Sequence, residues 1–189
     1  MISTTRFLKT AAAVATVAMA AGCATQAPNY SASIDNVQKL QDSVKQPIKV
    51  GAFAAKPGAV GATSIQLRAV SMASPVGGGY AAYLSEALKQ ELELAKLLNA
   101  SSNVEITGTL LGTDIDTAMG TASGYAEAQF VVTKDGKVRF DKVKRGQSSW
   151  ESSFVGAVAI PKAQQSYPVI VQQLLGALFA DPDFTSALK

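Results

Sequence analysis

The chain has 189 residues, of which 48% are hydrophobic and only 16% are charged, with 17 basic and 14 acidic side chains. It contains no histidine and a single cysteine. These counts exclude Ser-His-Asp and Cys-His catalysis, the usual histidine and cysteine zinc sites, and an intramolecular disulfide. Ser-Lys dyads and paired-carboxylate hydrolysis stay open on these counts, but no local motif supports either one. We expect a protein that folds around a packed core, binds no cofactor and is not an enzyme.

The first segment of the chain has the pattern of a secretory signal. Arg6 and Lys9 are its only charged side chains, and an almost wholly apolar run spans residues 11–21. A transmembrane helix needs ~20 apolar residues, so this run is too short to be one. We expect residues 1–22 to be removed as a signal peptide. Because Arg6 and Lys9 leave with it, the remaining chain is nearly neutral, and neither its charge nor its compartment favours a nucleic-acid partner.

Two cleavage sites compete before Cys23. Ala18-Met19-Ala20 fits the small-x-small site of ordinary signal peptidase, which would leave Cys23 as a free thiol. Ala20-Ala21-Gly22-Cys23 resembles the lipobox of bacterial lipoproteins, whose cysteine becomes the first mature residue and carries fatty acids such as palmitate. An unpaired thiol is a liability in an oxidising compartment, which favours the lipobox. The resemblance implies a lipid anchor at Cys23, and Ala24 in place of aspartate implies the periplasm-facing outer membrane.

Residues 23–46 are expected to hold the anchor, a tether and a short helix. The residues of the stretch 24–33 are small and polar, which is typical of a flexible tether. Ile34, Val37, Leu40 and Val44 then recur at helical spacing. The polar positions between them are mixed in charge, so this helix is expected to pack on the domain and not on the membrane.

Residues 47–189 are expected to form one periplasmic domain. Strand patterns occupy 48–53, 64–70, 104–110, 125–133 and 138–150, and helical patterns occupy 80–98 and 160–179, with Pro168 as a kink or a second start. Asp135-Gly136 predicts a type I′ hairpin, and a phase change near 144–146 predicts a bulge. The fold class predicted is α+β: a single antiparallel sheet of about five strands with two helices packed on one face.

Glu91 is the unusual residue of the helix predicted at 80–98, because it falls within the apolar arc. A carboxylate there must be paired or reach solvent. We expect it to be buried in an ion pair with Arg68 or to reach solvent at the sheet edge. The alternative is that Glu91 lines a ligand cavity between helix and sheet.

A run of basic side chains surrounds the predicted hairpin. Such a run could contact anionic headgroups or lipopolysaccharide phosphates, or it could be a solvated sheet edge whose lysines discourage aggregation. The candidate contact residues are Lys134, Lys137, Arg139, Lys142, Lys144 and Arg145.

The lipobox and four further stretches resemble small, uncharacterised outer-membrane lipoproteins and, more loosely, the auxiliary lipoproteins of ABC-type lipid transport systems. The stretches are YLSEALKQELELA, VEITGTL, AEAQFVVTKDGKVRFDK and YPVIVQQLLGALFADPDF. The resemblance implies a lipid-anchored accessory or scaffold protein of the cell envelope, acting by contact with an envelope protein in envelope assembly or lipid transport. The alternative is a carrier or sensor that binds an apolar ligand between helix and sheet. No functional residue beyond Cys23 follows from the resemblance.

Overall fold

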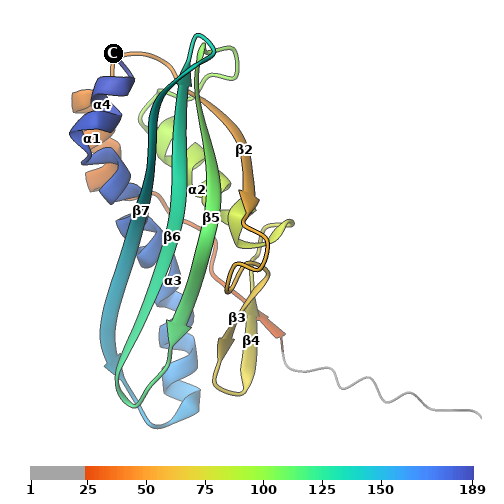
Figure 1. Ribbon diagram of the computed structural model, residues 1–189. Coiled ribbons are helices and arrows are strands. Elements are labelled where there is room, and N and C mark those ends of the chain that lie inside the picture. Colours follow the sequence, from red (N-terminus) through yellow and green to blue (C-terminus); the bar gives the residue numbers. More distant parts are fainter. Residues whose placement is uncertain (1–23) are drawn as a thin grey trace, which may run out of the picture.

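The computed structural model describes residues 24–189, so the predicted leader and Cys23 lie outside the described part of the chain. Two sheets form, one with the order β2-β5-β6-β7 and one with the order β1-β4-β3 (Figure 1). The elements in chain order are β1 (Ala24–Gln26), α1 (Ile34–Ser43), β2 (Lys49–Ala55), β3 (Ser64–Leu67), β4 (Val70–Ala73), α2 (Gly79–Leu94), β5 (Val104–Asp116), β6 (Gly120–Lys134), β7 (Lys137–Ser152), α3 (Gly156–Phe179) and α4 (Pro182–Ala187).

The predicted single antiparallel sheet with two helices is wrong, although the α+β class holds. β2 pairs parallel to β5, because the chain between them crosses over through α2. The strand expected over 64–70 is broken at Arg68, whose φ of 54° reverses the chain and produces the β3–β4 hairpin. That hairpin pairs with β1 instead of joining the larger sheet. Parallel pairing and strand breaks depend on distant segments, which local alternation does not reveal.

The expected hairpin at Asp135-Gly136 is confirmed. Both residues have positive φ, 51° and 74°, and Lys134 pairs with Lys137 across the two-residue turn. The expected bulge near residues 144–146 is wrong, since pairing between β6 and β7 continues unbroken there and shifts only between Val132 and Thr133. The apparent phase change arose because β7 turns two lysines, Lys142 and Lys144, toward the helices.

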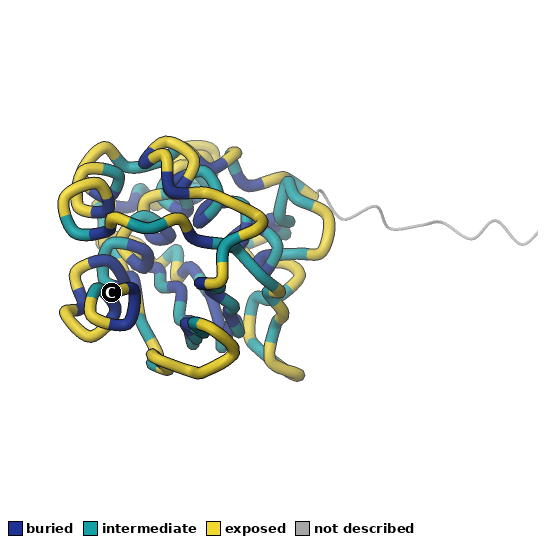
Figure 2. Tube along the Cα trace, turned by 90° about the horizontal axis from the view of Figure 1, so that it is seen from above, coloured by how far each residue is buried: buried dark blue, intermediate teal, exposed yellow. Residues whose placement is uncertain are grey.

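Helices cover one face of the larger sheet. α2 packs on β2 and β5, α3 packs on β6 and β7, and α1 packs on these two helices. Seen from above, buried segments lie between helices and sheet while exposed ones form the outside (Figure 2). The face of β6 expected to be buried is confirmed by the low exposure of Ala126, Ala128, Phe130 and Val132. No helix within residues 24–189 is long and apolar enough to cross a membrane.

α3 reaches the sheet closely at one glycine. A Cβ at Gly146 would lie 2.2 Å from the backbone nitrogen of Leu174 and 2.4 Å from the carbonyl oxygen of Ile170. α3 is one continuous helix from Gly156 to Phe179, and Pro168 lies inside it. The alternative that a second helix starts at Pro168 is therefore wrong.

The segment expected to be a flexible tether is part of the folded domain. Residues Ala24–Gln26 pair with Ser71–Ala73, and the backbone N–H of Ala27 donates to the Ala73 carbonyl at 2.9 Å. Tyr30 is buried at 7% exposure. Docking of α1 on the domain is confirmed by the complete burial of Leu40. Because the residues of this stretch are small and polar, its composition does not indicate that it packs on the domain.

Candidate functional site

Glu91 is fully buried and holds the N-terminal segment against α2. Its Oε1 accepts hydrogen bonds from the Tyr30 hydroxyl at 2.5 Å, the Ser33 backbone N–H at 3.0 Å and the Asn36 Nδ2 at 3.2 Å. Asn36 also donates to the Gln172 carbonyl at 3.0 Å, which connects the same cluster to α3. Glu91 Oε2 has no hydrogen-bond partner among the described residues.

The phenol of Tyr30 remains a proton donor in this cluster. Burial raises the pKa of Tyr30 far above its ordinary value, and the hydrogen bond and charge of Glu91 raise it further. The T-shaped packing of Tyr30 on Tyr83, with ring centroids 6.2 Å apart, holds the hydroxyl in position. The cluster is therefore a structural latch, which we name the Glu91 latch: Tyr30, Ser33, Asn36 and Glu91.

Arg68 does not pair with Glu91, so the structure does not bring these two predicted residues together. Its guanidinium donates instead to three backbone carbonyls, those of Thr117, Ser153 and Phe154. The donor–acceptor distances run from 2.7 Å to Ser153 to 3.2 Å to Thr117. Arg68 thereby ties the β3–β4 turn to the β5–β6 turn and to the connection between β7 and α3.

The six basic residues around the hairpin do not form one surface. Lys142 and Lys144 point toward the helices, where both reach the carboxylate of Asp181, a residue only 8% exposed. Lys142 Nζ also lies 2.6 Å from Asp183 Oδ2. The hydrogen bond from Lys144 lowers the pKa of Asp181 well below its usual range. These two lysines therefore neutralise a buried carboxylate at the start of α4.

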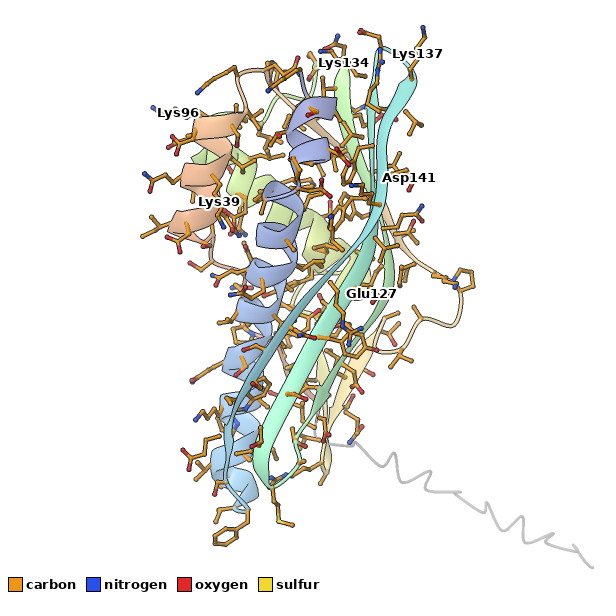
Figure 3. The ribbon with its side chains drawn as sticks, turned by 60° about the vertical axis from the view of Figure 1, so that its left-hand side comes forward. Lys39, Lys96, Glu127, Lys134, Lys137 and Asp141 are labelled. Carbon is orange, nitrogen blue, oxygen red and sulfur yellow. The ribbon has the colours of Figure 1, made fainter. Side chains whose placement is uncertain are left out.

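The other four basic side chains lie at separate places. Arg145 stacks on the Tyr125 ring, with its guanidinium carbon 3.9 Å from the centroid, and pairs with Glu127 at 3.1 Å. Lys134 donates to the Lys189 carbonyl at 2.7 Å. Lys137 and Arg139 are exposed and form no ion pair within residues 24–189. Lys137 lies at the hairpin end of the molecule (Figure 3).

A polar groove on the outer sheet face was missed by sequence reasoning. Glu127 and Asp141 project from this face, away from the helices (Figure 3). The groove encloses about 550 Å³ and is lined by Asp114, Asp116, Ser123, Gly124, Tyr125, Arg145, Gln147, Ser148 and Ser149. Counting back from the Asp135-Gly136 turn without a shift places Glu127 opposite Lys144. The observed shift between Val132 and Thr133 places it opposite Arg145 instead, so the turn alone does not predict the groove.

Sequence reasoning also missed a group of exposed apolar side chains at the end of the sheet opposite the Asp135-Gly136 hairpin. Met119 lies in the β5–β6 turn, Phe154 and Val155 connect β7 to α3, and Val158 lies in the first turn of α3. Their exposed fractions are 74%, 78%, 43% and 57%. Met119, Phe154 and Val158 border one surface pocket of about 510 Å³. We call Met119, Phe154, Val155 and Val158 the apolar end.

Neither a family model nor a curated protein matches the chain. Among solved structures, protein XCC0632 from Xanthomonas campestris, of the DUF330 family, superimposes with a TM-score of 0.51 at 10% identity, over 82% of this chain and 94% of that one. The hypothetical protein CT253 from Chlamydia trachomatis gives a TM-score of 0.40 at 10% identity, over 72% of this chain and 100% of that one. At such identity the first likeness shows a shared fold alone.

Proposed function

We propose that this chain, which shares the fold of the DUF330 protein, is a lipid-anchored accessory protein of the bacterial cell envelope. Cys23 holds it at the periplasmic side of the outer membrane, and the domain acts by contact with a partner protein. The observation that carries the proposal is the uncovered outer face of the β2-β5-β6-β7 sheet, which three long strands of 13, 15 and 16 residues present.

The outer face has the chemistry of a protein-binding surface. No element within residues 24–189 covers it, and its groove combines an aromatic ring, a guanidinium and several hydroxyl and carboxylate groups. Tyrosine and arginine are enriched in protein interfaces and among the residues that dominate binding energy. Because Arg145 already stacks on Tyr125 and pairs with Glu127, it loses little side-chain freedom when a partner binds.

The start of the domain supports an anchoring role for Cys23. Ala24, the residue that follows Cys23, already belongs to β1, and the Glu91 latch holds the chain again at Tyr30 and Ser33. An acyl group on Cys23 would therefore hold the domain close to the membrane surface and in a limited range of orientations.

The carrier alternative lacks a comparable observation. It requires an apolar space between helix and sheet beside Glu91. The volume beside the Glu91 carboxylate is occupied by the Tyr30 and Asn36 side chains, which are 7% and 3% exposed. The groove of about 550 Å³ lies on the outer sheet face and is mainly polar in its lining residues.

A photo-crosslinking amino acid placed in the full chain in cells tests the proposed contact surface. At Ser123, which is exposed in the outer groove, we expect one discrete crosslinked protein, and Arg145→Glu should abolish it. The matched control is the same amino acid at Asp42, an exposed residue of α1 on the helix side. Absence of a crosslink at Ser123, or equal crosslinks at both positions, would contradict the outer face as the partner site.

A further inference from the structure

The apolar end is held in place by Arg68. The Arg68 guanidinium donates to the carbonyls of Ser153 and Phe154 at 2.7 and 3.1 Å and to the Thr117 carbonyl at 3.1 and 3.2 Å. These carbonyls belong to the two connections that carry Met119, Phe154 and Val155. Two chain segments that would otherwise be separate loops are thus fixed side by side, with apolar side chains exposed.

The chain enters the domain at this same end. β1 runs parallel to β4, with Ala24 opposite Ser71, so the start of β1 lies at the end of β4 that adjoins the Arg68 turn. Ser71 is three residues from Arg68, about 10 Å at the rise of a strand. Figure 1 shows the β3–β4 turn, the β5–β6 turn and the start of α3 together at the lower end of the molecule. Cys23 immediately precedes Ala24.

We infer that the apolar end enters the lipid interface beside the anchor, so that the domain meets the membrane through two contacts. The inference rests on the proposed acylation of Cys23. Phe154 and Met119 supply side chains that partition into the boundary between headgroups and acyl chains. Lys162, exposed on the rim of the same pocket, can reach anionic headgroups.

The size and place of the apolar end favour a lipid surface over a protein partner. Stable protein interfaces involve ~20–30 residues on each side, far more than this group of four side chains. A shallow insertion needs only a few apolar side chains once a covalent anchor keeps them at the surface. The outer sheet face, by contrast, points sideways from the axis that joins the apolar end to the hairpin (Figure 3).

Depth-dependent fluorescence quenching tests this contact in the full chain. Cys23 is the only native cysteine, and acylation blocks its thiol, so Phe154→Cys provides a single labelling site. The acylated protein is labelled with bimane and placed in vesicles of phosphatidylethanolamine and phosphatidylglycerol that contain nitroxide-bearing acyl chains. Val158→Cys is the second variant at the apolar end. Lys137→Cys is the matched control, exposed at the hairpin end.

Several-fold stronger quenching at positions 154 and 158 than at 137 is the expected result. Equal quenching at all three positions in acylated, vesicle-bound protein would overturn the lipid contact while leaving the anchor intact. Weak quenching in vesicles together with protection of position 154 from thiol reagents in native envelopes would also overturn it, in favour of a protein partner. Absence of acylation, measured by mass spectrometry of the N-terminal peptide, would overturn both the contact and the proposed anchor.

Discussion

At the scale of single residues, two buried carboxylates connect segments that are far apart in the sequence. Glu91 accepts from a tyrosine 61 positions before it, and Asp181 accepts from Lys144, 37 positions before it. Glu91 lies on the apolar face of α2, where helical periodicity alone would place an apolar side chain, and Asp181 is the N-cap residue of α4. The two residues differ in partner: Glu91 is held by neutral donors, whereas Asp181 is held by ammonium groups.

Glu91→Ala should lower the free energy of unfolding by about 3 kcal/mol, because buried donors of the latch lose their acceptor. Urea denaturation followed by circular dichroism measures the change. Glu93→Ala is the matched control, since Glu93 is an exposed residue of the same helix and should change stability by less than about 0.5 kcal/mol. Equal effects of the two substitutions would contradict the latch.

Asp181 should make stability depend on pH in the acidic range. Its pKa is lower in the folded protein than in the unfolded chain, so its stabilising contribution is complete above the unfolded pKa of about 4 and is lost as the pH falls toward the folded value. Asp181→Asn keeps an acceptor for the Asp183 N–H but removes the charge. We expect wild type to exceed this variant in stability at neutral pH and the difference to shrink below about pH 4.

The cap and the charge of Asp181 can be separated by a second variant. Asp181→Ala loses the hydrogen bond to the Asp183 N–H as well as the ion pairs, and should be about 1 kcal/mol less stable than Asp181→Asn. Urea unfolding of the three proteins at several pH values measures both quantities. A difference between wild type and Asp181→Asn that stays constant with pH would refute the electrostatic account.

At the scale of elements, the contact between α3 and β7 depends on the absence of a side chain. Gly146→Ala should destabilise the protein by about 1–3 kcal/mol, because the added methyl group meets the backbone of α3 and the helix must shift. Gly156→Ala is the matched control: its Cβ would meet only the Ile160 Cδ1, at an ordinary 3.8 Å. Thermal unfolding compares the two, and a harmless Gly146→Ala would show that α3 tolerates more distance than the packing indicates.

At the scale of the whole molecule, we expect the anchor proposed at Cys23 to decide where the domain is found. Cys23→Ser should release the protein from the outer-membrane fraction into the soluble periplasm and should remove labelling by a fatty-acid probe. The physical reason is that multiple acyl chains give stable membrane attachment, whereas a few inserted side chains give only weak, reversible binding. Equal fatty-acid labelling of wild type and Cys23→Ser would mean that Cys23 is not the attachment site.

Much of the local structure could be predicted from the sequence, because its causes are local. The Asp135-Gly136 hairpin follows from the φ angles that a two-residue turn requires, and the buried face of β6 follows from strict alternation. The helix that begins at Gly79 and the docking of α1 follow from apolar spacing. The absence of histidine likewise restricts the available chemistry without any knowledge of the fold.

The pairings between distant segments were decided only by the tertiary structure. Parallel pairing of β2 with β5, the docking of β1, the partners of Arg68 and the inward lysines of β7 each depend on where another segment lies. These pairings are stabilised by contacts that form only when distant segments come together in the folded chain. The periodicity of the sequence therefore does not predict them. The sequence by itself determined the main helices, the long strands and the candidate anchor, because periodicity and motifs are local. The tertiary contacts decided the docking of β1, the division of β3 from β4 and which faces the elements leave free.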